Sequence, residues 1–317
     1  MTRLTAQSLK GIWAAITMAW DEHFAFDETS YVENTRRLIR SRVDGIFTTG
    51  STGEFYALEY DEFRRMVDLQ AALCGEAGTP LQIGCCADAT AKTLRLFEYA
   101  CRHPQVGAVQ VTIPYWMEMT DREVLRFFKD VHTACPQMPL VHYNIPRAKR
   151  FLHAADYRRI LDVAPSLIGV KYTFAGSHFG NLQADLALTP ELSFFVGEDL
   201  LVSGMLLGVR GSYSSLVSTR PAFMLEMFEK AEGGRWEEAI VMQKHASAFF
   251  RELDEWLGER GEGGIDPVAD KGLSVAAGFF TGSQRCRAPY LGWSDETVSG
   301  LRVWLRERYP EFLAEPV

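Results

Sequence analysis

The chain has 317 residues, of which 47% are hydrophobic and 23% are charged, so it belongs to the ordinary range of folded globular proteins and is not largely disordered. Its net charge of −8 would repel phosphate backbones and anionic lipid headgroups, which argues against nucleic acid and membrane surfaces as partners. No segment reaches the roughly 20 apolar residues of a membrane span, and no apolar signal core follows the N-terminus. We therefore expect a cytoplasmic protein.

The six cysteines are scattered, with no C-x-x-C pair and no Cys/His grouping at the spacing of a zinc site. This distribution predicts buried free thiols in a reducing compartment and gives no sign of a metal centre. The cysteines are Cys74, Cys85, Cys86, Cys101, Cys135 and Cys286.

Eight short apolar runs rich in β-branched residues occur in the first two thirds of the chain. They cover residues 12–17, 45–49, 81–84, 108–113, 140–143, 168–172, 192–196 and 209–213. Segments with helical periodicity lie between them, including 31–42, 61–74, 91–101, 121–133 and 156–163. Apolar strands that alternate with helices predict a parallel sheet buried on both faces. Eight such units favour a closed (β/α)8 barrel, a TIM barrel, with an open doubly wound sheet as the alternative.

The strand pattern ends near residue 220. Segments 221–231, 236–257 and 296–308 have helical periodicity, and the glycine-rich stretch 258–264 predicts a surface loop or a helix break. We therefore divide the chain into a barrel, residues 1–220, and a C-terminal helical region, residues 221–317. No G-x-G-x-x-G motif follows the first strand, which argues against a dinucleotide site.

Functional residues of such a barrel lie in the turns that follow the strands. The second strand is followed by the sequence GSTGE at residues 50–54. Gly50 permits a tight turn, and the backbone N–H groups and hydroxyls of Ser51 and Thr52 can hold a carboxylate or a phosphate. The alternative for this segment alone is an ordinary glycine-rich turn.

The fifth and sixth strands each carry one chemically active group. Tyr143 ends the fifth strand and can transfer a proton at the barrel mouth, whereas its neighbour His142 faces the other side and is expected to pack. Lys171 lies within the apolar sixth strand. Burial disfavours the charged amine, and a neutral amine can form a Schiff base with a carbonyl. The alternative is a strand-end lysine whose amine reaches water.

An anion-holding turn, a phenol and a buried amine at one barrel mouth together predict chemistry on a 2-oxo acid. The turn would hold the carboxylate, the amine would attack the ketone and the phenol would transfer protons.

These motifs resemble those of the dihydrodipicolinate synthase and N-acetylneuraminate lyase superfamily of pyruvate-dependent class I aldolases. The resemblance covers most of the chain in the same order. It rests on GIWA at 11–14, GSTGE at 50–54, YNIP at 143–146, GVK at 169–171, GED at 197–199 and the segment 208–215.

The resemblance implies a Schiff base on Lys171, a pyruvyl carboxylate held by Ser51 and Thr52, and Tyr143 as the acid/base catalyst. Thr52 would orient Tyr143 or relay protons to it. It also implies carbon–carbon bond cleavage or formation between pyruvate, or another 2-oxo acid, and an aldehyde through an enamine, with no metal or other cofactor. The family usually forms tetramers, so we expect a homo-oligomer, a tetramer or a dimer.

Several positions near these motifs bear on which second substrate is used. Ala148 stands where dihydrodipicolinate synthases usually have an arginine, with Arg147 one place earlier, and Leu200 replaces a glutamate of sialic acid lyases. A different group, the hydratase-aldolases that cleave arylidene pyruvates, is resembled by segments 114–119 and 143–151 and by the pair Glu198 and Asp199. Those enzymes have a less hydroxyl-rich turn than residues 50–54. An apolar wall for such a substrate could come from Phe55, Tyr56, Tyr115, Trp116, Tyr172 and Phe174.

The remaining candidates for substrate binding are Thr173, Asp199, Tyr213 and Ser215, and Glu54 is expected to fix its turn rather than to act as a base. Two alternatives to the aldolase reaction stay open. One is dehydration or hydration of a 2-keto-3-deoxy sugar acid through the same lysine imine. The other is a non-catalytic barrel that binds a 2-oxo acid.

Overall fold

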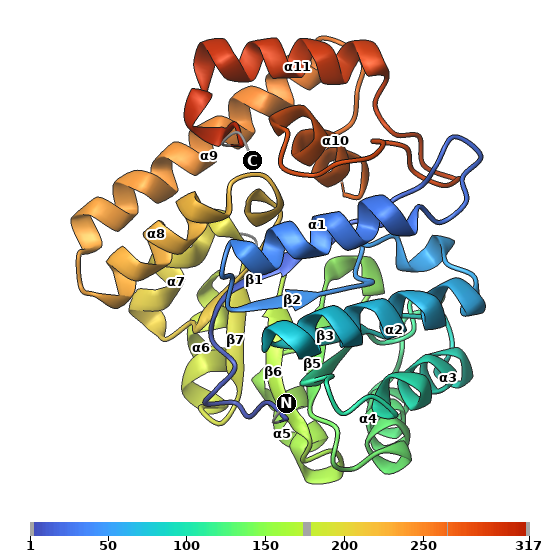
Figure 1. Cartoon of the computed structure of the whole chain (residues 1–317). Helices are drawn as coiled ribbons and strands as arrows, with labels where there is room; N and C mark the ends of the chain where they lie inside the picture. The colour runs from blue at the N-terminus through green and yellow to red at the C-terminus, as the bar shows by residue number, and fades with distance from the viewer. Residues whose placement is uncertain (1–2, 174–178, 265, 315–317) are drawn as a thin grey trace.

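The structure is a computed structural model, and it describes residues 3–173, 179–264 and 266–314. Eight parallel strands close into a barrel in the order β1 to β8, with β8 paired to β1 (Figure 1). The predicted TIM barrel is thus confirmed. Its strands are β1 (Gly11–Ala15), β2 (Gly45–Phe47), β3 (Leu81–Gly84), β4 (Ala108–Val111), β5 (Leu140–Asn144), β6 (Leu167–Tyr172), β7 (Ser193–Val196) and β8 (Gly211–Ser214).

Helices connect consecutive strands and cover the outside of the barrel (Figure 1). They are α1 (Glu28–Arg40), α2 (Tyr60–Ala77), α3 (Thr90–Cys101), α4 (Asp121–Ala134), α5 (Ala154–Val163), α6 (Phe179–Leu188) and α7 (Leu201–Leu207). Local sequence defines several helix starts. Thr120 and Glu123 form a capping box at α4, and Asp27 caps α1 by accepting from the Ser30 amide.

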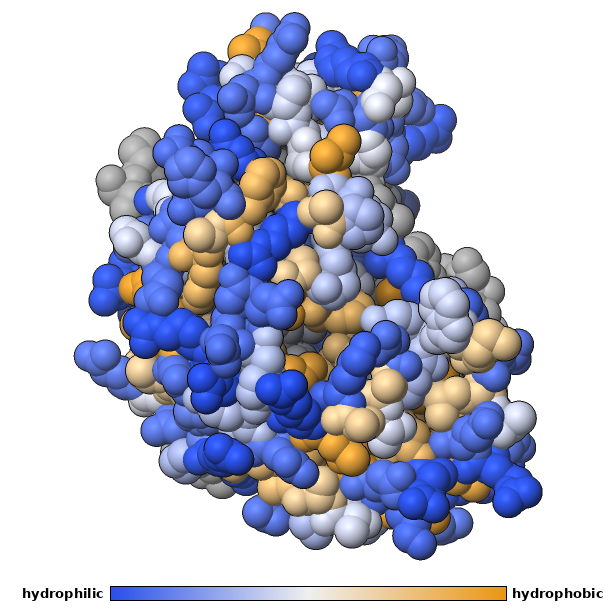
Figure 2. Space-filling model, turned by 90° about the vertical axis from the view of Figure 1, so that its right-hand side faces the viewer, coloured by the Kyte–Doolittle hydropathy of each residue, from blue (hydrophilic) through white to orange (hydrophobic). Residues whose placement is uncertain are grey.

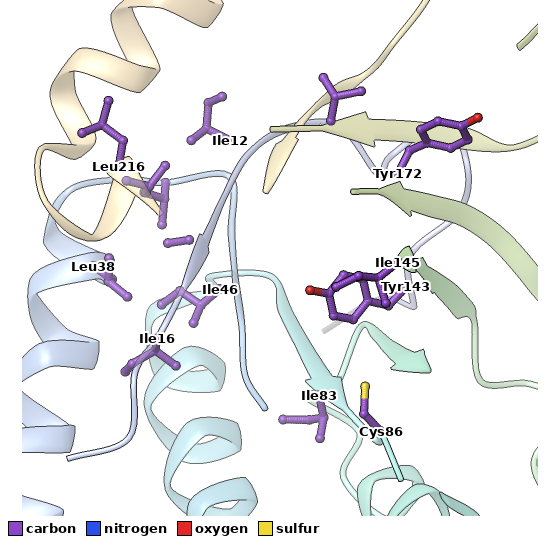
Figure 3. Packing of buried hydrophobic residues seen from close by; sticks show 14 of the residues in the cluster. Ile12, Ile16, Leu38, Ile46, Ile83, Cys86, Tyr143, Ile145, Tyr172 and Leu216 are labelled. Carbon is purple, nitrogen blue, oxygen red and sulfur yellow. The ribbon is translucent and has the colours of Figure 1, made fainter. Parts of the chain in front are cut away.

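Strand alternation divides the buried side chains into two cores. Trp13, Phe47, Val141, Phe195 and Tyr213 pack together inside the barrel. A second and larger core contains most of the outward-facing strand residues and fills the space between strands and helices; Figure 3 shows part of it, together with Tyr143 at the barrel mouth. This alternation decides which strand residues can reach a site at the barrel mouth.

The C-terminal region begins with α8 (Pro221–Glu232), which packs on β1 and α7 and so occupies the place of the eighth barrel helix. The predicted boundary at residue 220 therefore separates β8 from α8, although α8 packs on the barrel. Helix α9 (Trp236–Gly258) packs on α8, and α10 (Val268–Ala277) packs on α11 (Asp295–Arg308). Helices α9, α10 and α11 gather at one end of the molecule, at the top of Figure 1.

Helix α10 is fixed to the barrel by a buried ion pair. The side chains of Lys271 and Glu54 are 2% and 0% exposed, and the Lys271 amine donates to Glu54 Oε1. The other carboxylate oxygen of Glu54 accepts from Trp20 Nε1 and from the Arg287 amide, at 3.0 Å each. Glu54 therefore does fix its turn, but it does so by joining that turn to the C-terminal region.

The side of the molecule in Figure 2 is mostly hydrophilic, with apolar side chains in small groups. A notch separates the narrower C-terminal region from the barrel below it (Figure 2). No helix in the described part of the chain is long and apolar enough to cross a membrane.

Candidate active site

Lys171 points into the barrel mouth from β6. Its Nζ lies 4.2 Å from the centre of the Tyr143 ring, 4.6 Å from that of Phe47 and 5.6 Å from that of Tyr213. Across residues 3–173, 179–264 and 266–314, Nζ makes no hydrogen bond and no ion pair. The amine therefore packs on aromatic rings, and no described residue forms a hydrogen bond with it.

This environment makes the amine easier to deprotonate. Burial lowers the pKa of Lys171 to about 8, and the carboxylates of Asp266 and Asp270 oppose that shift. An amine with this pKa is partly neutral near physiological pH and can act as a nucleophile. The alternative of a strand-end lysine in water does not fit this geometry.

Tyr143 stands directly beside Lys171, because the two residues are partners in the β5–β6 register. The Tyr143 hydroxyl lies 3.3 Å from Ser51 Oγ. Burial raises the pKa of Tyr143 well above its usual value, with Asp266 adding to the effect. The phenol therefore keeps its proton in the resting site and can donate it.

The GSTGE turn is shaped by close packing. A Cβ on Gly50 would lie 2.8 Å from the Phe47 ring, and one on Gly53 would lie 2.6 Å from the Thr49 amide nitrogen. Thr49 and Glu54 at the two ends of the turn both have positive φ, 48° and 49°. Within the described part of the chain the Ser51 and Thr52 amides donate to no protein acceptor, so they remain available for an anion.

Thr52 has a different partner from the expected one. Its Oγ1 donates to Asp270 Oδ2 of α10 at 2.5 Å, and it is Ser51 that contacts Tyr143. The expectation that Thr52 orients Tyr143 therefore has to be corrected, because adjacent residues of the turn point in different directions. Burial raises the pKa of Asp270 to about 7, and the nearby Asp266 adds to the shift.

These groups line two connected hollows at the barrel mouth. The larger, of about 570 Å³, contains Lys171, Thr52 and several carboxylates. The smaller, of about 270 Å³, has an aromatic wall of Phe55, Tyr56, Tyr115 and Tyr290. Tyr143, Ile145, Arg147 and Asp266 line both.

Arg147 and Asp266 form an ion pair at the junction of the two hollows, with Nη2 and Oδ1 2.7 Å apart. The guanidinium thus faces the site one place before Ala148, which is itself buried and lines the aromatic hollow. A cation for a second carboxylate is therefore present, although it is already paired with Asp266.

The four predicted substrate-binding residues all line the larger hollow. Thr173 Oγ1 is buried and has no partner among the described residues, and partial desolvation raises the pKa of Asp199. Ser215 Oγ donates to Glu198 at 3.0 Å. Tyr213 lies below Lys171, and its hydroxyl donates to Gln82 at 2.8 Å, so it forms the floor of the site.

The structure places only some of the expected wall aromatics at the smaller hollow. Phe55, Tyr56 and Tyr115 line the smaller hollow. Tyr172 is one of the residues along the larger hollow, but its hydroxyl donates to Asp185 at 2.9 Å and in Figure 3 points away from that of Tyr143. Trp116 is 76% exposed and lines neither hollow. Phe174 lies outside the described residues.

Other expectations concern groups away from the chemistry. His142 faces outward, as expected, and its Nδ1 lies 2.9 Å from the Tyr157 hydroxyl. The cysteines are free, and all but the half-buried Cys101 are buried. No group of three or more His, Cys, Asp or Glu side chains is arranged to hold a metal ion within the described residues.

Three site residues were not foreseen from the sequence: Asp266, Asp270 and Tyr290, all from the C-terminal region.

A hollow of about 860 Å³ lies elsewhere, at the N-terminal ends of the strands, and it is lined by Ser193 and Arg210 but by no lysine or tyrosine. The candidate catalytic lysine and tyrosine therefore lie at the barrel mouth formed by the C-terminal strand ends, not at this hollow.

The fold and the residues at this mouth are those of a (β/α)8-barrel enzyme. The sequence profile of the dihydrodipicolinate synthetase family matches residues 8–258, about four fifths of the chain. The chain therefore belongs to this family, and it is a lyase.

Individual relatives differ in the reaction their names describe. The chain is 26% identical to a 4-hydroxy-tetrahydrodipicolinate synthase of Ehrlichia canis over 245 residues, which cover 76% of this chain and 80% of that protein. It is 24% identical to a trans-O-hydroxybenzylidenepyruvate hydratase-aldolase of Pseudomonas putida over 307 residues, 91% of this chain and 89% of that protein. The dihydrodipicolinate synthase structure from Aquifex aeolicus superimposes with a TM-score of 0.84 at 19% identity, covering 97% of this chain and all of the other.

Proposed function

We propose that the protein is a class I lyase that forms a Schiff base between Lys171 and pyruvate, or a closely related 2-oxo acid, and makes or breaks a carbon–carbon bond to an aldehyde. The observation that carries the proposal is the Lys171 amine, which has no hydrogen-bond or ion-pair partner among the described residues, packs on aromatic rings and has a lowered pKa. Family membership supports the same reaction class.

The geometry supports a role in this reaction for each neighbour. The free amides of Ser51 and Thr52 hold the carboxylate of the 2-oxo acid and bring its ketone to Lys171. The protonated imine withdraws electrons, so the bond between C3 and C4 of a 4-hydroxy-2-oxo acid can break to give an enamine. Tyr143 lies beside the amine: in bond formation its phenol donates a proton to the aldehyde oxygen, and in cleavage its phenolate takes the proton of the C4 hydroxyl.

The smaller hollow favours an aromatic aldehyde as the second reactant. Its wall of four aromatic side chains opens onto Ser51 and Tyr143, so a ring bonded to C4 would stack there while the pyruvyl part occupies the turn. The match to the hydratase-aldolase covers 91% of this chain, so it reaches into the C-terminal region that supplies Asp266, and it supports the same choice.

Dehydration of a 2-keto-3-deoxy sugar acid through the same imine remains the second candidate. The observation in its favour is the larger hollow, where Asp199, Ser215 and Thr173 could bind hydroxyl groups. Product analysis separates the two reactions, because only the aldol reaction releases pyruvate together with an aldehyde.

The test is a panel of 4-hydroxy-2-oxo acids and arylidene pyruvates assayed for released pyruvate and aldehyde. We expect pyruvate release that is highest with aryl substrates and is lost in Lys171→Ala. Lys129→Ala, which removes an exposed amine of α4, serves as the control. A dehydrated 2-oxo acid without free pyruvate would support the second candidate, and no turnover with trapped pyruvate would support a binding protein.

A further inference from the structure

We propose that Asp270 supplies, through the Thr52 hydroxyl, the proton that removes water when the imine forms on Lys171. A residue of the C-terminal region would then serve the covalent step on the barrel. This inference rests on the proposed imine chemistry and adds a proton pathway separate from Tyr143.

The contact is direct and enclosed. Thr52 Oγ1 and Asp270 Oδ2 are 2.5 Å apart, the two residues are 7% and 8% exposed, and both line the hollow that contains Lys171. Ser51, the neighbour of Thr52, contacts Tyr143 instead. Two successive hydroxyls of one turn therefore lead to two different titratable groups, a phenol and a carboxyl.

The position of Asp270 is held from several directions. The next residue, Lys271, forms the buried ion pair with Glu54 at the end of the same turn. Ser274 Oγ donates to the Asp270 carbonyl at 2.6 Å. The Lys271–Glu54 pair thus fixes the turn to the start of α10 next to the Thr52 contact, and a short hydrogen bond between Thr52 and Asp270 can persist through turnover.

Charge makes a protonated Asp270 reasonable. Asp266 and Glu198 face it as further acids, Lys171 faces it as a base, and a bound 2-oxo acid would add a carboxylate at Thr52. Nearby negative charges favour the neutral form of a buried carboxylic acid. Burial and these acids raise the pKa of Asp270 to about 7, whereas the pKa of Tyr143 is raised well above its ordinary value, so the carboxyl is the stronger acid.

The step balances as follows. The neutral Lys171 amine adds to C2 of the 2-oxo acid and gives a carbinolamine with a hydroxyl on C2. For this step the Thr52 hydroxyl turns from Asp270, to which it donates in the resting site, and passes its proton to the hydroxyl on C2, while the protonated Asp270 passes its own proton to Thr52 Oγ1. The C2–O bond breaks, water leaves, and the nitrogen lone pair forms the C=N bond. The site then holds a cationic imine and an ionised Asp270, and hydrolysis of the product imine returns the proton.

The test measures the rate of imine formation with pyruvate, by rapid quenching into borohydride and intact-protein mass, between pH 5.5 and 9. Asp270→Asn and Thr52→Val should each slow the rate about 100-fold, the size expected for loss of one acid catalyst, and should remove the pH dependence near 7. Thr52→Ser should restore the rate. The final trapped fraction should stay unchanged, because only the rate depends on the relay.

The matched control is Asp68→Asn, which removes a carboxyl that accepts a hydroxyl hydrogen bond from Tyr99 at 2.7 Å and lines neither hollow. We expect it to leave the rate and the pH profile unchanged. A wild-type rate and profile in both Asp270→Asn and Thr52→Val would overturn the inference, and if Asp270→Asn does not fold, Thr52→Val alone decides. Absence of any pyruvate adduct in the wild-type protein would instead refute the proposed function.

Discussion

The most informative prediction concerns the protonation of Lys171. Its amine rests on the rings of Tyr143, Phe47 and Tyr213, and burial lowers its pKa to about 8 from an ordinary lysine value of 10.5. At pH 7 this shift raises the fraction of neutral amine about 300-fold, from about 0.03% to about 10%. Since the group loses its proton as the pH rises, its reactivity should increase tenfold per pH unit below 8 and level off above it.

Competitive acetylation measures this directly. The protein is labelled with a trace of acetic anhydride at pH values from 6 to 11, and the extent of modification of each lysine is read by peptide mass spectrometry. The exposed Lys129 serves as the internal reference. Asp266→Asn should move the Lys171 inflection to lower pH, because that carboxylate opposes the depression of the pKa. A Lys171 profile that coincides with that of Lys129 would refute the argument.

Three further predictions test other parts of the site. Tyr143→Phe should lower turnover by about 10²- to 10⁴-fold in steady-state assays while pyruvate is still trapped, and a loss of trapping would contradict its role in proton transfer. Glu54→Gln should lower the free energy of unfolding by about 3–5 kcal/mol in urea titrations, since it removes the carboxylate partner of the buried Lys271 amine. Glu28→Gln, at the exposed pair with Arg65, should lower it by at most about 1 kcal/mol. Equal losses would argue that the Lys271–Glu54 ion pair does not hold α10 to the barrel. Tyr290→Ala should raise KM for the aryl substrate several-fold and leave that for pyruvate unchanged; equal changes would count against an aromatic subsite.

The barrel was predictable because each strand is a short apolar run followed by a turn, a local pattern that does not depend on distant residues. Lys171 and Tyr143 could be placed at one mouth because parallel strands end on the same side of a barrel. Strand alternation also predicts that the Tyr172 side chain faces outward, since it follows Lys171 directly. Composition alone does not show this, because it counts aromatic residues without their direction.

The contribution of the C-terminal region could not be predicted. Asp270 meets Thr52 across 218 positions of sequence, and no local pattern reports such a contact. The adjacent charges of Asp270 and Lys271 are typical of a solvated helix face, yet both residues are buried. Each is compensated by a partner on the turn at residues 50–54, which only the folded chain brings within reach.

Borohydride reduction in the presence of pyruvate, followed by peptide mapping, tests the central claim most directly. One reduced pyruvyl group should appear on the peptide that contains Lys171, and none should form in Lys171→Ala. An unmodified Lys171, or an adduct that forms equally on exposed lysines, would contradict the proposed covalent chemistry.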